Sequence, residues 1–323
     1  MKAQYYAQRA GAGLIIAEAT GISQEGSGWP SAPGIWSDEQ VAAWQPVTRA
    51  VHDAGGRIIL QLWHMGRIVH PDFLGGAAPV SSSATTAPGN AHTNVGKQPY
   101  AQARALRLDE IPRVVADYVH AAQNAMRAGF DGVQVHAANG YLIDQFLRDN
   151  SNFRTDAYGG PIANRIRLLG EVTQAVADTV GADRTSVRLS PNGDTQGCDD
   201  SNPVALFTAA AAALNDIGIG FLELREQKDF GGFGTTDVPR VSPDIRRVFA
   251  GSLVLNQEYD RARADADLAS GLADAISFGR PFISNPDLAL RLRNGAALTP
   301  DNYKTWYSPG SEGYVDYPVL AAT

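Results

Sequence analysis

Cysteine is nearly absent from this chain, since Cys198 is the only one among 323 residues. A single thiol excludes an internal disulfide framework, a cysteine-ligated zinc site and an iron–sulfur cluster, because each of these needs several thiolates. The chain also lacks an apolar run long enough to span a bilayer, and no signal-peptide pattern opens it. We therefore expect a cytoplasmic protein without a membrane partner.

Basic blocks are absent as well. The formal net charge is -7, from 27 Lys and Arg against 34 Asp and Glu, and no stretch is rich in lysine or arginine. A nucleic-acid backbone is therefore not an expected partner. No cluster of Asp, Glu and His suggests a metal site, so we predict none. What remains is a chain long enough to bury most of its apolar surface unaided.

Short apolar runs rich in β-branched residues alternate with amphipathic helical stretches along most of the chain. The pattern predicts strands at residues 14–19, 57–63, 132–136, 186–190, 220–224, 253–256 and 275–278. It predicts helices at residues 1–10, 38–53, 109–128, 162–180, 203–216, 243–249, 260–270 and 287–294. Good helix caps are Ser37, Asp109, Asn202 and Ser242. This alternation is typical of a parallel sheet with helical crossovers.

A closed barrel of parallel strands normally has eight of them, whereas the pattern here yields seven. The helix at residues 1–10 has no strand before it. The simplest interpretation is an α/β fold, a (β/α)8 TIM barrel whose first strand is missing from this chain. Residues 1–323 would form one domain, with a loop excursion at residues 66–108. An open doubly wound sheet is the alternative, and it is disfavoured because no Gly-x-Gly-x-x-Gly follows the first strand.

Several predicted strands carry polar residues. In a parallel sheet covered by helices the outward face is apolar, so polar strand residues are expected to point into the lumen. This applies to Gln61, Gln134, His136, Arg188 and Glu223. The simpler interpretation is a structural hydrogen-bonding role, and we prefer it for Gln134 and Glu223. For the other three, a position near the rim where barrel enzymes keep their sites favours function.

The run from Val133 to Tyr141 combines three groups that can handle a carbonyl and a proton. His136 and Asn139 can both donate a hydrogen bond to one oxygen, and the Tyr141 hydroxyl is a weak acid. The sequence therefore predicts these three as catalytic residues.

The last two predicted strands carry a second signal. Asn256 and Gln257 end one strand, and Gly279 and Arg280 follow the other. Barrels often bind a phosphate in the loops after these strands, where glycine lets the backbone approach and arginine pairs with the dianion. An arginine that merely covers the rim is the alternative.

Aromatic residues gather in the loops near the same rim, among them Trp29, Trp63 and Phe282. Most aromatics pack in cores, but a planar cofactor and a planar substrate need some of them as walls. The loop at residues 226–236, rich in glycine and with two phenylalanines, is expected to shape the pocket mouth.

Taken together, the residues resemble the Old Yellow Enzyme family of FMN-dependent ene-reductases, in its bacterial branch. The resemblance covers essentially the whole chain. Its motifs are Glu18-Ala-Thr-Gly-Ile-Ser23, Gln61-Leu-Trp-His64, His136 to Tyr141, Asp156-Ala-Tyr-Gly-Gly160, Asn164-Arg165, Val187-Arg-Leu-Ser-Pro191 and Phe278-Gly-Arg-Pro-Phe282.

By position, the resemblance implies a role for each candidate residue. His136 and Asn139 would hold the carbonyl or nitro oxygen of an activated alkene, and Tyr141 would protonate its α carbon. Flavin contacts would come from Gln61 and Arg188 at the ring edge, Ala19 beside the ring, and Asn256, Gln257, Gly279 and Arg280 at the phosphate. The substrate pocket would be lined by Trp29, Trp63 and Phe282.

The resemblance also implies a two-step reaction. NADPH or NADH gives hydride to FMN, and the flavin passes it to the β carbon of an enone, enal, maleimide or nitroalkene. The two donors polarise the alkene and stabilise the developing enolate. Such a small-molecule alkene is the expected partner, and the pattern leaves monomer and homodimer open.

The family's first barrel strand supplies a threonine to the flavin, and nothing in this chain provides that segment. One rival interpretation is therefore a truncated, inactive flavin-binding or scaffold relative. A second rival is a lyase or aldolase with His136 as its base, which is disfavoured because no lysine lies in the predicted strands to form a Schiff base.

Overall fold

The protein is described by a computed structural model covering residues 1–323 except 228–235, 237, 307–308 and 321–323. Parallel strands form one sheet at its centre, in the order β1-β3-β8-β9-β10-β11-β12, with β2 also paired to β3. The strands are β1 (Ile15–Ile16), β2 (Thr20–Gly21), β3 (Ile58–Trp63), β8 (Gly132–His136), β9 (Thr185–Leu189), β10 (Phe221–Arg225), β11 (Ser252–Asn256) and β12 (Ala275–Ser277). The predicted α/β barrel architecture is confirmed, and the predicted strands lie within a few residues of those observed.

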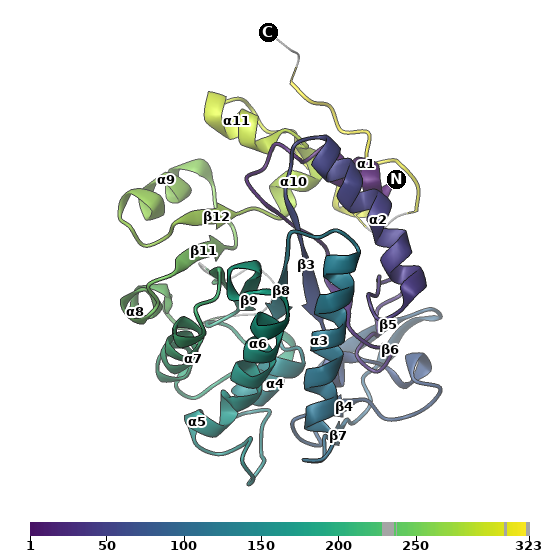
Figure 1. Ribbon diagram of the computed structural model, residues 1–323, viewed down its shortest axis with the longest axis vertical. Coiled ribbons are helices and arrows are strands. Elements are labelled where there is room, and N and C mark those ends of the chain that lie inside the picture. Colours follow the sequence, from purple (N-terminus) through teal and green to yellow (C-terminus); the bar gives the residue numbers. More distant parts are fainter. Residues whose placement is uncertain (228–235, 237, 307–308, 321–323) are drawn as a thin grey trace.

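Helices follow one another in an arc outside the strands (Figure 1). They are α2 (Asp38–Asp53), α3 (Ile111–Arg127), α5 (Ile162–Arg165), α6 (Arg167–Val180), α7 (Pro203–Ile217), α8 (Ser242–Val248) and α9 (Arg261–Ala269). Their apolar faces meet the outward strand residues in one core that runs from Tyr6 to Phe278. Among the described residues, no helix is both long and apolar enough to cross a bilayer.

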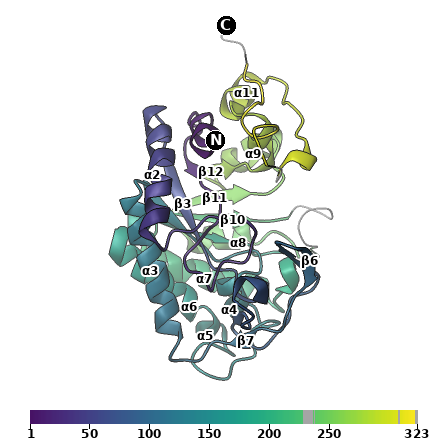
Figure 2. The same cartoon turned by 90° about the vertical axis from the view of Figure 1, so that its right-hand side faces the viewer.

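The sheet's path ends at β1 and β12, and no pairing joins these two strands in the described part of the chain. The N-terminal helix α1 (Lys2–Ala7) lies between α2 and the C-terminal helices α10 (Arg280–Ser284) and α11 (Leu288–Asn294), as Figure 2 shows. Arg9, just after α1, donates to the backbone carbonyls of Phe282 and Ile283, each at 2.9 Å. The first and last parts of the chain are thereby joined beside the open edge.

Local sequence signals explain some helix ends. Ser37 accepts from the backbone N–H of Gln40, whose side chain bonds back to the N–H of Ser37, so α2 begins with the predicted cap as a full capping box. The Asn202 side chain caps α7 by accepting from the backbone N–H of Ala205 at 3.1 Å. The α7 helix then ends at Gly218 in the left-handed conformation, with φ 75°.

Two predicted caps are wrong, the first because its side chain binds another residue and the second because another residue binds the helix N–H groups. Asp109 pairs with Arg107 at 3.0 Å, and Glu110 precedes α3 without a side-chain cap. At α8, Ser242 lies inside the helix, and the carboxylate of Glu226 accepts from the N–H groups of Val241 and Ser242 at 2.6 and 2.9 Å. A distant acid therefore caps this helix.

The predicted strand at residues 14–19 is interrupted after β1, and β2 begins just past its predicted end. The N–H of Glu18 donates to the Tyr6 hydroxyl at 3.0 Å instead of to a strand. The predicted helix at residues 162–180 is likewise divided at Ile166, which ends α5 and precedes α6. In the described part of the chain, two short α-helices were not predicted: α4 (Leu142–Leu147) and α10.

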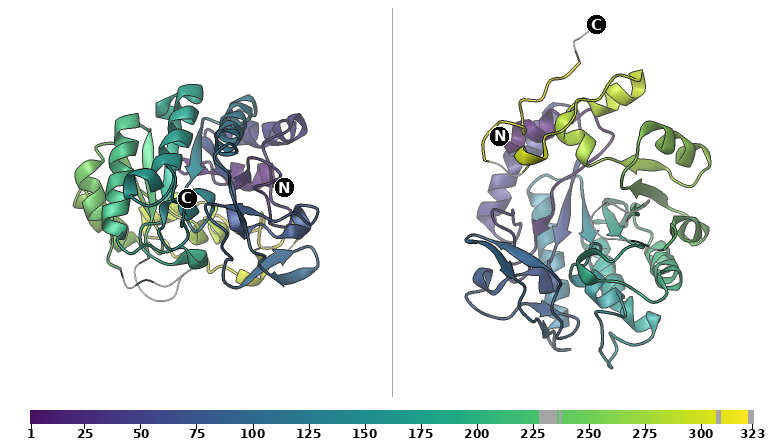
Figure 3. Two further views of the ribbon diagram at one scale, coloured as in Figure 1. Left: turned by 90° about the horizontal axis from the view of Figure 1, so that it is seen from below. Right: turned by 180° about the vertical axis from the view of Figure 1, so that it is seen from behind.

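The excursion at residues 66–108 is more ordered than the predicted loop. It contains the antiparallel hairpin β5 (Asn90–Thr93) and β6 (Gly96–Pro99), and the parallel pair β4 (Val80–Ser81) and β7 (Arg104–Ala105). Figure 3 shows the hairpin on the side of the molecule opposite α9. The predicted pocket-mouth loop at residues 226–236 falls largely outside the described residues.

The capping box generates a stability prediction. Ser37→Ala removes the acceptor for Gln40 N–H, so we expect the free energy of unfolding to fall by about 1 kcal/mol in a urea titration. Ser37→Asp keeps an acceptor at the same place and should unfold near the wild-type midpoint. Equal losses in the two variants would contradict the capping role.

Candidate active site

Polar side chains from five strands are linked inside the carboxyl half of the sheet. The carboxylate of Glu223, which is 1% exposed, accepts from Arg188 at 2.7 Å, Ser277 at 2.5 Å and Gln134 at 3.0 Å. Gln134 in turn accepts from Gln61 Nε2 at 2.6 Å. The polar strand residues therefore form one lumen network in which Glu223 is the central acceptor.

Arg188 occupies the rim side of this network. Its second Nη group donates to Asn256 Oδ1 at 2.8 Å, and Asn256 Nδ2 donates to the carbonyl of Ser277 at 2.9 Å. The guanidinium is thus fixed by β10 and β11 together. Asn256, predicted to help at a phosphate, has its side chain engaged between β9 and β12.

His136 is the last residue of β8, and Asn139 and Tyr141 lie in the turn that follows it. The Tyr141 ring meets the His136 ring edge-on, with centroids 5.0 Å apart, and meets the Trp63 ring in the same way at 5.0 Å. His136 is 4% exposed, and its Nδ1 atom has no hydrogen-bond partner within the described structure. A buried imidazole nitrogen without a partner is suited to a ligand oxygen.

The turn that carries these groups has an unusual backbone. Asn139 and Gly140 both have positive φ, at 60° and 75°. The Asn139 N–H donates to Ser190 Oγ at 2.8 Å, and the Gly140 N–H donates to Asp144 Oδ2 at 2.8 Å. A Cβ on Gly140 would lie 2.5 Å from the carbonyl of Thr195, so both its φ and its packing require glycine.

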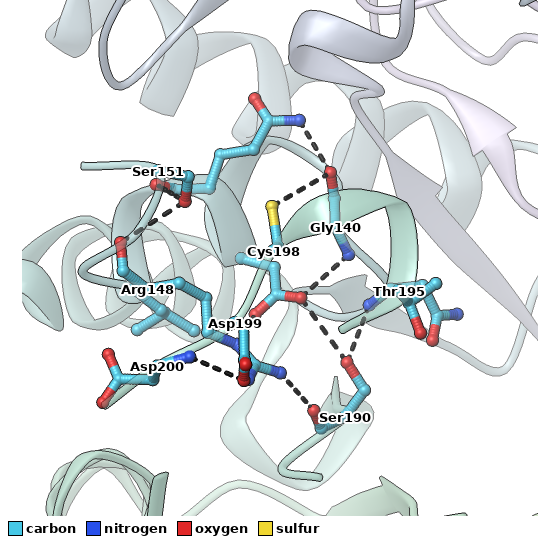
Figure 4. A network of polar contacts seen from close by, with 12 residues as sticks. Gly140, Arg148, Ser151, Ser190, Thr195, Cys198, Asp199 and Asp200 are labelled. Carbon is cyan, nitrogen blue, oxygen red and sulfur yellow. Dashed lines mark hydrogen bonds and ion pairs between the residues drawn. The ribbon is translucent and has the colours of Figure 1, made fainter. Parts of the chain in front are cut away.

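A buried network of polar contacts holds this turn in place (Figure 4). Asp144 pairs with Arg148 at 2.9 Å, with both side chains 1% exposed, and Arg148 also donates to the carbonyl of Ser190. Cys198 packs against Gly140 in the same network, and burial raises the pKa of its thiol to about 11. The thiol therefore stays protonated and serves packing.

Burial holds the pKa of His136 well below its usual range, and the nearby cations of Arg188 and Arg225 lower it further. A neutral imidazole presents one N–H donor and one acceptor. The positive charges at this rim therefore belong to arginines, and His136 acts as a neutral polar group.

Arg225 was not predicted from the sequence. It is the last residue of β10, and its Nη1 donates to Asn139 Oδ1 at 3.0 Å and to Thr195 Oγ1 at 3.1 Å, while its Nε donates to Gln257 Oε1 at 3.1 Å. The predicted strand ended one residue earlier. Continuing the alternation from Glu223 by two residues would have placed Arg225 on the lumen side.

Apolar groups enclose one side of the site. Trp63, Met65, Ile68, Val69 and Ala87 form a buried cluster, against which Ala19, Trp29 and Tyr141 pack. Phe282, the third predicted pocket aromatic, lies in α10, where its carbonyl accepts from Arg9. The structure thus brings Trp29, Trp63 and Ala19 to Tyr141 in one cluster, which Phe282 does not join.

Gly279 and Arg280 lie after β12 as predicted. Gly279 has φ −94°, and a Cβ there would meet no described residue within 4 Å, so neither the backbone conformation nor packing in the described part of the chain demands glycine. Gln257 has φ 96°, a conformation that strains a side-chain-bearing residue. Open space at Gly279, beside the Arg280 cation, fits the approach of an anionic group.

These features define a class of protein: an α/β barrel enzyme whose polar groups meet at the carboxyl ends of parallel strands. The profile of the NADH:flavin oxidoreductase / NADH oxidase family matches residues 1–299. The chain belongs to this family, in its Old Yellow Enzyme group, and it is an NAD(P)H-dependent flavin oxidoreductase that uses FMN. The family predicted from the sequence is thereby confirmed.

Solved structures and curated sequences give the similarity in detail. An old yellow enzyme homologue from Zymomonas mobilis is 61% identical, with a TM-score of 0.97 over 99% of this chain and 90% of that one. Morphinone reductase in complex with tetrahydroNAD is 45% identical, with a TM-score of 0.93 over 99% and 88%. The 12-oxophytodienoate reductase 1 of Oryza sativa subsp. japonica is 41% identical over 98% of this chain and 84% of its own length.

The Gly140 turn generates a prediction with an internal control. In Gly140→Ala the new methyl group must displace the Thr195 carbonyl at a positive φ, so we expect a loss of about 1–3 kcal/mol in the free energy of unfolding. Gly170→Ala, near the start of α6 and with no described residue within 4 Å of its Cβ, should instead stabilise the protein by up to about 1 kcal/mol. Urea titration of both variants measures the change in the free energy of unfolding. Equal changes in the two would contradict the prediction.

A second prediction concerns pH. In the unfolded chain the His136 ring takes up a proton near pH 6.5, whereas its depressed pKa keeps the folded ring neutral there. The unfolded state then binds more protons, so stability falls as the pH drops below about 6.5. His136→Asn should lose less unfolding free energy between about pH 7 and pH 5.5 than the wild type. Urea titration at each pH tests this, and identical pH dependence in both proteins would contradict it.

Proposed function

We propose that this protein is an ene-reductase that transfers hydride to the β carbon of activated alkenes, namely enones, enals, maleimides or nitroalkenes. The observation that carries the proposal is the grouping of His136, Asn139 and Tyr141 at the barrel rim, where the His136 ring is buried and its Nδ1 atom has no hydrogen-bond partner among the described residues. Relatives named morphinone reductase and 12-oxophytodienoate reductase act, by their names, on oxo compounds, which supports a substrate with an oxygen to be held.

The residues present fit FMN. When bound, FMN supplies the hydride that it receives from NAD(P)H. Gln61 and Arg188, both fixed by the lumen network, would bind the ring edge, and Ala19 would leave room beside the ring. The phosphate would be held by Gly279 and Arg280 with the loop that contains Asn256 and Gln257.

The chain's own side chains then account for the remaining chemistry. His136 and Asn139 donate to the substrate oxygen, draw electron density from the alkene and stabilise the developing enolate. The Tyr141 hydroxyl gives its proton to the α carbon. Trp63 and Trp29, packed in the same apolar cluster, keep water away from the reacting atoms, and Phe282 is proposed as a further pocket residue.

The proposal predicts different effects on the two half-reactions. In Tyr141→Phe the hydroxyl proton is lost, so reoxidation of the reduced protein by 2-cyclohexenone should slow by about 10²–10⁴-fold. Bleaching of the flavin absorption by NADPH without air should stay within a few-fold of the wild type. Anaerobic stopped-flow absorbance measures both rates.

Two outcomes would count against the proposal. If Tyr141→Phe reoxidises at the wild-type rate, Tyr141 is not the proton donor. If the wild-type protein is bleached by NADPH but no activated alkene restores its colour, the rival interpretation of an inactive flavin-binding relative is favoured.

A further inference from the structure

Arg225 has contacts that no role assigned so far explains. Its side chain extends from the end of β10, where Arg225 is paired in register with Asn256 of β11, and it is 5% exposed. It donates to Asn139 after β8, to Thr195 after β9 and to Gln257 after β11. One guanidinium at the end of β10 therefore connects the loops that follow β8, β9 and β11.

The chemistry of the guanidinium decides what it does to Asn139. Arginine has only N–H donors and no acceptor, so the amide atom of Asn139 that faces it must be Oδ1. The amide nitrogen, with its two N–H groups, is then turned to the other side. Without this contact, Asn139 could present either its oxygen or its nitrogen to a ligand.

Two of the Arg225 hydrogen bonds go to residues with a strained backbone. Asn139 has φ 60° and Gln257 has φ 96°, and each receives a hydrogen bond from Arg225. Residues with a side chain keep such conformations only when their surroundings hold them. Arg225 thus supports one turn beside the predicted substrate oxygen and one beside the predicted FMN phosphate.

We propose that Arg225 is the positioning residue of the substrate-oxygen site: it orients the Asn139 amide so that Nδ2 donates to the ligand oxygen. This inference rests on the proposed ene-reductase function, because that function assigns Asn139 as an oxygen donor. Arg225 also places a cation near His136, which agrees with the lowered pKa of that ring.

Binding of 4-hydroxybenzaldehyde, a planar phenol with no reducible C=C bond, tests the proposal without turnover. The flavin absorbance of the holoenzyme reports its Kd. In Arg225→Met the donor to Asn139 is lost, and we expect the Kd to rise about 10- to 100-fold, as for loss of a hydrogen bond to a charged group. Arg246→Met is the matched control, because Arg246 also binds loop carbonyls, of Phe249 and Gly251, but before β11 at the opposite end of the barrel. Its Kd should stay unchanged.

Two further variants separate orientation from packing. Lysine has only donors, so Arg225→Lys should recover most of the affinity, whereas glutamine has both a donor and an acceptor, so Arg225→Gln should not. In the Asn139→Ala background, Arg225→Met should change the Kd by less than about threefold, because the group it orients is already gone. The comparison of Arg225→Lys with Arg225→Gln tests the proposal even if Arg225→Met itself fails to fold.

The outcomes are distinct. An unchanged Kd in Arg225→Met, or an equal loss with and without Asn139, would overturn the positioning role. Equal affinities in Arg225→Lys and Arg225→Gln would also overturn it. If the wild type binds the phenol with the expected Arg225 dependence but reduces no alkene, the proposed function fails while the positioning role stands.

Discussion

The structure of the site depends on one buried carboxylate, Glu223. A charge in the barrel lumen costs free energy unless it is paired and hydrogen-bonded, and Arg188, Gln134 and Ser277 meet that requirement from β9, β8 and β12. Removing any one of them would leave polar groups unsatisfied in the interior. The need to satisfy Glu223 therefore fixes the rim positions of Arg188 and, through Gln134, of Gln61.

The sequence was informative where a feature follows from local periodicity. Alternation along each strand predicted Gln61, Gln134, Arg188 and Glu223 as inward residues, and the structure shows them bonded to one another in the lumen. The same rule missed Arg225 only because the predicted strand stopped at residue 224. A structural role for Gln134 and Glu223 was the preferred interpretation, and their contacts agree with it. The same contacts also hold Gln61 and Arg188, two of the predicted flavin-binding residues.

Features decided by distant partners could not be predicted in this way. Ser242 matches the pattern of a cap, but the N–H groups at the start of the helix donate instead to the carboxylate of Glu226, which follows the previous strand. Glu18 lies in an apparent strand, but the Tyr6 hydroxyl binds its N–H. In each case a tertiary hydrogen bond competes with a local preference worth about 1 kcal/mol or less. The position of Gly140 against the Thr195 carbonyl is of the same kind, because only the folded chain brings the two together.

The site combines charged groups, which are arginines, with a neutral histidine. His136 is kept neutral by burial, with Arg188 and Arg225 adding to the effect. A protonated imidazole would stabilise a developing enolate more strongly, but it would also have to be formed at a cost in the presence of two cations. With the arginine charges permanent and the donors neutral, the proposed site would stabilise negative charge on a substrate oxygen by groups that need no proton uptake and no rearrangement during the reaction. In the role proposed for it, Arg225 would supply both parts, since it contributes a permanent charge and, through its bond to Asn139, would set the direction of a neutral donor.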